Sequence, residues 1–117
     1  MQKEIQSRED IERLVANFYT KVRKDELLAP VFAHVDWDHH TPIITDFWSS
    51  ILLGDQSYQG NPFQKHIGLA INPKHFERWL ELFKQTLNEN FEGAVAEEAI
   101  SRANSIAKMF QFRLGLI

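Results

Sequence analysis

The side chains of this sequence that could bind a transition metal are its five histidines, because the chain has no cysteine. They are His34, His39, His40, His66 and His75. The His-Glu-x-x-His pattern of zinc hydrolases is absent. Any bound metal is therefore expected to use histidine or carboxylate ligands, and each histidine taken alone is expected to be a surface residue.

Other patterns of catalytic residues are also missing. The paired Glu-x-x-His pattern of di-iron helical bundles is absent, and its nearest match, Asp-Trp-Asp-His at residues 36–39, stands alone. A serine hydrolase would need a Gly-x-Ser-x-Gly nucleophile turn, which the chain lacks. Paired carboxylates for glycoside chemistry stay open, since a sequence does not show their separation in space, but nothing favours them.

A set of polar-tipped side chains interrupts the apolar patterns. His66 lies in a short segment flanked by glycines, while Tyr19, Trp79 and His40 belong to or extend otherwise apolar helix faces. A buried tyrosine hydroxyl or tryptophan N–H needs a hydrogen-bond partner. Two interpretations stay open from spacing alone: these groups form the polar part of a pocket, or Tyr19 and Trp79 bond to backbone carbonyls inside an ordinary core.

Charge and composition exclude several classes of partner. Lysine and arginine number 13 against 16 aspartate and glutamate, a net charge of −3, so no basic field exists to hold a nucleic acid. The absence of cysteine excludes a disulfide framework, a thiolate zinc site, an iron–sulfur cluster and a cysteine nucleophile. The N-terminus does not resemble a signal peptide, and no stretch approaches the ~20 apolar residues of a membrane span. We expect a cytoplasmic protein with no nucleic-acid or membrane partner.

The elements that must position these side chains are helices. Apolar residues recur at helical spacing, and no segment of comparable length alternates as a half-buried strand would. Helix starts are indicated by a capping-box-like Ser7–Asp10 and by Asn72 followed by Pro73. The pattern predicts an all-α fold with helices over about 8–24, from Thr41-Pro42 to before Gly54, over 73–90 and over 94–113.

The remaining segments connect these helices. Pro30 favours a tight apolar corner after the first helix. Glycines and prolines between residues 54 and 73 leave room for one short helix around 63–67, which carries His66. With no repeat or linker, residues 1–117 are expected to form a single domain.

A series of short motifs runs along nearly the whole chain. They are Phe18-Tyr19, Pro30-Val31-Phe32, Phe47-Trp48, Leu53-Gly54, Tyr58-x-Gly60-x-Pro62-x-x-x-His66 and His75-Phe76-x-x-Trp79-Leu80-x-Leu82-Phe83. Each motif is weak alone, but their order and spacing together resemble the truncated haemoglobins, and within them group III. The chain also lacks a Gly-Gly pair, which is a further resemblance to that group.

The resemblance implies a truncated globin fold, a two-over-two helical sandwich around haem b (iron protoporphyrin IX), with His66 as the iron ligand. It implies distal roles for Tyr19, Trp79 and His40. Because Pro42 restrains the start of the distal helix, His40 is expected either to point at the iron or to swing outward as a gate. The other cofactor contacts that the resemblance implies are apolar: Phe32, Ile44, Phe47, Trp48, Phe76, Phe83 and Phe110.

The function that the resemblance implies is reversible binding of oxygen, nitric oxide and carbon monoxide at a pentacoordinate iron. Two well-aimed donors would hold oxygen too tightly for bulk transport, which favours ligand capture, nitric oxide dioxygenation or peroxide-type turnover with a separate reductase. Whether the protein is an enzyme stays open. The alternative is a small helical module that binds a partner helix or an apolar ligand without haem, and a haem-based sensor with a fused output domain is a third class.

Overall fold

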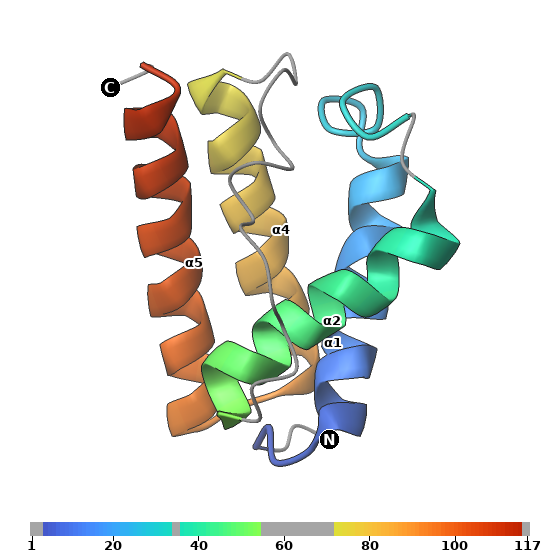
Figure 1. Cartoon of the computed structure of the whole chain (residues 1–117), viewed down its shortest axis with the longest axis vertical. Helices are drawn as coiled ribbons and strands as arrows, with labels where there is room; N and C mark the ends of the chain where they lie inside the picture. Colours follow the sequence, from blue (N-terminus) through green and yellow to red (C-terminus); the bar gives the residue numbers. More distant parts are fainter. Residues whose placement is uncertain (1–3, 34–35, 55–71, 116–117) are drawn as a thin grey trace.

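The computed structural model describes residues 4–33, 36–54 and 72–115, and these residues form four α-helices. They are α1 (Arg8–Lys24), α2 (Trp37–Leu53), α4 (Pro73–Asn90) and α5 (Ala94–Arg113). Figure 1 shows α4 and α5 side by side and antiparallel, with α2 crossing α1. Contacts also join α1 to α4 and α2 to α5. The predicted all-α class is confirmed over the described ranges.

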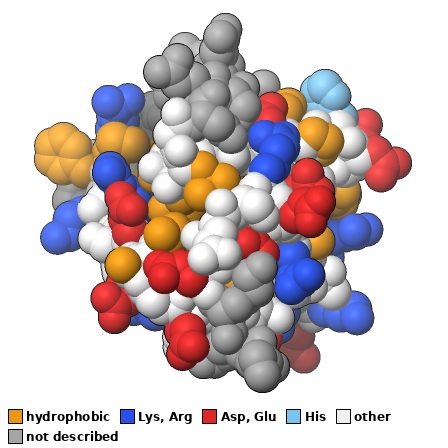
Figure 2. Space-filling view, turned by 90° about the horizontal axis from the view of Figure 1, so that it is seen from below, with side chains coloured by type: hydrophobic (Ala, Val, Ile, Leu, Met, Phe, Trp, Pro, Cys, Tyr) orange, Lys and Arg blue, Asp and Glu red, His pale blue; other side chains and the backbone are white. Residues whose placement is uncertain are grey.

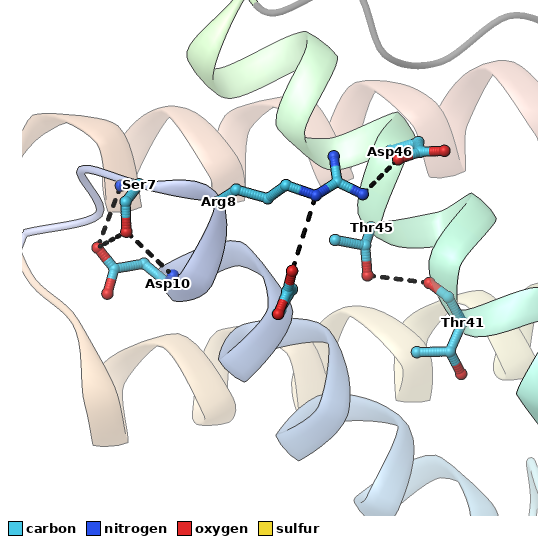
Figure 3. A network of polar contacts seen from close by, with 7 residues as sticks. Ser7, Arg8, Asp10, Thr41, Thr45 and Asp46 are labelled. Atoms are coloured by element: carbon cyan, nitrogen blue, oxygen red, sulfur yellow. Dashed lines mark hydrogen bonds and ion pairs between the residues drawn. The ribbon is translucent and has the colours of Figure 1, made fainter.

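Side-chain caps mark the starts of three of the four described helices, α1, α2 and α4. Ser7 and Asp10 form a capping box at the start of α1 (Figure 3). The buried Asp10 carboxylate also accepts the Gln6 N–H at 2.9 Å. Asn72 caps α4 and is followed by Pro73 at the first helical position. The predicted bounds 8–24, 73–90 and 94–113 agree with the helices observed.

The predicted start of the second helix is wrong. α2 begins at Trp37 rather than near Thr41, because Asp36 caps it and its carbonyl accepts the His40 N–H at 2.8 Å. Thr41 was expected to avoid the helical region before Pro42, yet both lie inside α2. The proline costs one backbone hydrogen bond, and burial of the Trp37 ring against α1 offsets this loss. His40 therefore lies within the helix and not at its mouth.

The helices enclose one main hydrophobic core and a smaller cluster. The main core combines the inward stripe of α1, from Ile11 to Val22, with Phe83 of α4. α5 packs closely onto it through small side chains: Ala96, Ala99 and Ala103. The smaller cluster contains Phe76, Ala107 and Phe110, and Leu80 packs against both.

Polar contacts tie the helices together outside the core. Arg8 of α1 reaches Asp46 of α2 (Figure 3), and Lys21 Nζ lies 2.7 Å from a Glu89 carboxylate oxygen at the end of α4. In Figure 2 acidic and basic side chains are interspersed over the face seen from below. No helix in the described ranges is long and apolar enough to cross a membrane.

The N-terminal segment contacts the first turn of α5. A Glu4 carboxylate oxygen accepts the Val95 N–H at 3.2 Å. Gly93, at φ 101°, lets this carboxylate approach, because a Cβ there would come within 2.8 Å of the Glu4 side chain. A carboxylate at this place also stabilises the positive end of the helix dipole.

Candidate functional site

Tyr19 and Trp79 meet at the contact between α1 and α4. Tyr19 is 9% exposed and Trp79 is half-buried, and the Trp79 side chain is close enough to act on the Tyr19 hydroxyl as a hydrogen-bond donor that lowers its pKa. Because a tryptophan N–H can only donate, the Tyr19 hydroxyl oxygen accepts this bond. One of the two interpretations left open by spacing was that Trp79 bonds to a backbone carbonyl. In the described residues its indole instead has a side-chain partner, Tyr19.

Aromatic packing fixes the indole ring of Trp79. It stacks on Phe83, with ring centroids 5.6 Å apart and planes within 6°, and it meets Phe18 edge-on at 5.5 Å. Both neighbours are 1% exposed, so they are held by the core. The orientation of the N–H toward Tyr19 is therefore set before any ligand arrives.

Tyr19 stays protonated and can therefore donate a hydrogen bond. Burial raises the pKa of Tyr19 to about 12, and the hydrogen bond from Trp79 opposes this rise without cancelling it. The phenol therefore stays protonated at neutral pH. In the described part of the chain, the hydroxyl has no acceptor for its own proton, since its partner Trp79 donates to it. The pair thus presents one O–H proton to an incoming acceptor.

Two further rings enclose Tyr19. Trp37, the first residue of α2, lies 5.0 Å from the Tyr19 ring, and Phe32 lies 6.4 Å from it. His40 is half-buried, one turn along α2, and its ring meets Trp37 edge-on at 6.0 Å. Sequence reasoning missed Trp37. The signal that could have found it is the capping residue Asp36, which places Trp37 and His40 on the same face of one helix.

The other candidate side chains occupy three kinds of environment. Trp48 is 2% exposed and stacks on Phe83 at 4.9 Å, while Ile44 is buried beside it in the main core. Phe47 is half-buried and meets Trp48 edge-on. Phe76 and Phe110 lie together in the smaller cluster. His66 and its short helix lie outside the described residues.

An ion pair fastens α1 to α4 next to the Tyr19–Trp79 pair. Arg78 Nε donates to Asp25 Oδ1 at 2.7 Å, and the Asp25 carboxylate also accepts the N–H groups of Leu27 and Leu28. Burial alone would raise the pKa of the Asp25 carboxyl, but these hydrogen bonds and the Arg78 charge hold it below its ordinary 3.8. Asp25 therefore joins the end of α1, the following turn and α4.

We expect Asp25→Asn to lower the free energy of unfolding by about 1 kcal/mol at neutral pH. A hydrogen bond between charged groups usually contributes more, but the Arg78 side chain is partly exposed and solvent weakens the interaction. Because the folded-state pKa lies below 3.8, this contribution is complete above that value and is lost as the pH falls below it. Urea unfolding of both proteins at neutral and acidic pH should therefore show curves that converge in acid.

Glu81→Gln serves as the control for this prediction. Glu81 is a second, more exposed partner of Arg78 at 3.4 Å, so its loss should change stability little at either pH. If Asp25→Asn destabilised the protein equally at all pH values down to pH 2, the negative charge of Asp25 would not be the source of the stabilisation.

Comparisons with known proteins show which family the chain resembles in sequence and fold. The family model of the bacterial-like globins matches residues 3–112. A group 3 truncated haemoglobin of Campylobacter jejuni is 38% identical over 112 residues, which cover 90% of this chain and 88% of that protein. The crystal structure of a group III truncated haemoglobin from the same species matches with a TM-score of 0.86, covering 97% of this chain and 95% of that chain.

A second solved structure extends the similarity to another group. The group II truncated haemoglobin of Bacillus anthracis is 28% identical and superposes with a TM-score of 0.80 over 91% of this chain and 90% of that one. The four described helices thus have the two-over-two arrangement that the resemblance implied. The chain belongs to the bacterial-like, truncated haemoglobin family of haem-binding globins.

Proposed function

We propose that this protein binds haem b through His66 and captures diatomic gases with the help of Tyr19 and Trp79. When bound, haem supplies an iron atom with one coordination position open to a small ligand. The observation that carries the proposal is the pairing of the buried Tyr19 with the half-buried Trp79, in which the Tyr19 hydroxyl donates to no acceptor among the described residues. Its placement in a family of haem-binding globins supports the same assignment.

The described side chains fit a porphyrin in their chemistry. A porphyrin has apolar faces, and the half-buried Phe32 and Phe47 leave ring surface that can contact it. Trp48 and Phe83 are covered by other side chains, so we expect them to support the pocket wall from behind. Ile44, Phe76 and Phe110 complete the apolar contacts that we propose.

The Tyr19–Trp79 pair is suited to recognise a ligand that gains negative charge on binding. Trp79 donates to the Tyr19 oxygen, which directs the Tyr19 proton away from the indole and toward another acceptor. Donors fixed in advance in a site shielded from water stabilise developing charge more strongly than donors in water. We propose His40 as a third distal residue, close to Tyr19 through Trp37.

A protein that releases oxygen slowly is better suited to a reaction of the bound oxygen than to bulk oxygen transport. Oxygen held by the Tyr19 hydroxyl, which Trp79 orients, is released slowly, so we propose ligand capture, with nitric oxide dioxygenation as the reaction and peroxide turnover as the second candidate. Conversion of nitric oxide and oxygen to nitrate consumes one electron. We therefore propose a separate reductase as a partner.

An absorption spectrum of the purified protein tests the proposal. We expect a strong band in the near ultraviolet that shifts on reduction with dithionite and again on addition of carbon monoxide. A preparation that stays colourless after incubation with hemin would contradict the proposal. It would favour instead a helical module that binds an apolar ligand or a partner helix.

A further inference from the structure

Trp37 is held between two side chains of α1 that lie one turn apart. Its ring lies 5.0 Å from the ring of Tyr19, and the guanidinium carbon of Arg23 lies 5.4 Å from its centroid. The second distance is within the range of a cation–π interaction. Residues four apart on a helix share a face, so the Trp37 indole packs on the surface that Tyr19 and Arg23 form together.

Within the described residues, the guanidinium of Arg23 makes a cation–π contact with Trp37 and no ion pair. Other basic side chains that join elements have carboxylate partners, as Arg8 does with Asp46 and Lys21 with Glu89. Among the described residues Arg23 has no such partner, although its side chain is exposed. Its charge therefore acts on the indole face of Trp37 in this part of the chain.

Trp37 connects this surface residue to the interior. It is half-buried, and besides Tyr19 it meets Phe32 at 6.1 Å and His40 at 6.0 Å. Tyr19 keeps only 9% of its surface exposed with these rings around it. If the indole moved outward, water would gain access to the Tyr19 ring and would compete for the hydrogen bond between Tyr19 and Trp79.

We propose that Arg23 and Trp37 are positioning residues for Tyr19: Arg23 holds the Trp37 indole against the Tyr19 ring, and the indole shields Tyr19 and the neighbouring Trp79 N–H from water. An exposed arginine would thus control the strength of a buried donor. The inference rests on the proposed function, since the value of that donor depends on a ligand to receive its proton.

The test compares Arg23→Gln with Lys24→Gln in the haem-loaded protein. Both residues are exposed on the last turn of α1 and both changes remove one positive charge, but among the described residues Arg23 and not Lys24 contacts Trp37. The readout is solvent exchange of the Trp79 indole N–H, followed by NMR in the reduced, carbon monoxide-treated protein. The Ala103 amide, in the core of α5, monitors global unfolding.

Arg23→Gln is expected to speed indole exchange about two- to fivefold, the factor that corresponds to an exposed cation–π contact, while Lys24→Gln leaves it unchanged. Trp37→Leu should speed it further, and Trp37→Phe should restore part of the protection. Equal exchange in the Arg23 and Lys24 variants, whether raised or not, would overturn the proposal, because the loss of charge and not of the contact would then be the cause.

A second readout separates this inference from the proposed function. The C–O stretching frequency of the carbon monoxide-treated protein should shift in Tyr19→Phe if Tyr19 faces the ligand. A frequency that Tyr19→Phe leaves unchanged would contradict the proposed role of Tyr19. Indole exchange in Arg23→Gln would still decide whether Arg23 and Trp37 protect the pair.

Discussion

Replacing Tyr19 with phenylalanine is expected to speed oxygen release from the reduced protein by about ten- to a hundredfold. A hydrogen bond to a charged or charge-gaining partner contributes roughly 1.5–3 kcal/mol, and about 1.4 kcal/mol corresponds to a factor of ten. The ring contacts of Tyr19 with Phe18 and Trp37 survive the change, so the effect isolates the hydroxyl. Stopped-flow displacement of oxygen measures the rate.

Two companion variants sharpen this prediction. Trp79→Leu removes the donor that orients the Tyr19 hydroxyl, so it should speed release as well, and the double variant should be less than additive because the two side chains act together. Thr20→Val removes a solvent-exposed hydroxyl from the next position of α1 and should have no effect. Fast release in the unaltered protein that neither Tyr19→Phe nor Trp79→Leu changes would eliminate the capture hypothesis.

Replacing His66 with alanine is expected to abolish stable haem binding and to lower the melting temperature. A ligand present at a hundred times its Kd stabilises the folded state by about 2.7 kcal/mol, which for a chain of this size corresponds to roughly 10 °C. The haem-to-protein ratio from the absorption spectrum and a thermal scan measure both effects. His66 lies outside the described residues, so this variant tests the resemblance directly.

His39→Ala is the matched control for the His66 variant. His39 is exposed near the start of α2, and its removal should leave haem content and melting temperature unchanged. Full haem content in His66→Ala would move the ligand assignment to another histidine.

Local rules predicted most helix boundaries, and the prediction failed at the start of α2, where the Thr41-Pro42 pair was preferred to the capping residue Asp36. The bounds of α1 and α4 follow from capping residues beside them, which a sequence displays directly. The start of α2 was placed too late because the restriction imposed by Pro42 was taken as a boundary. Asp36 caps α2 one turn earlier, a signal that the sequence did contain, while helical periodicity does not reveal that the Trp37 ring will pack against Tyr19 of α1.

The candidate site was predictable in its parts and not in its connections. Tyr19 and Trp79 stood out as polar tips on apolar faces, yet only the packing of α1 on α4 brings them together. Trp37 and Arg23 were missed for the same reason, since a guanidinium over an indole depends on how α1 and α2 cross. Spacing predicts which face of a helix is buried, but contacts between helices depend on the tertiary arrangement.

The hydrogen bond from the Val95 N–H to the Glu4 carboxylate joins residues that are 91 positions apart in the sequence. Through it, Glu4 caps the N-terminal turn of α5. A truncation that starts at Ile5 would leave the opening turn of α5 with water in place of a carboxylate. Loss of order at the N-terminal segment would therefore also remove a hydrogen bond from the first turn of α5. Protease sites and affinity tags for this protein should accordingly be designed to keep Glu4 intact.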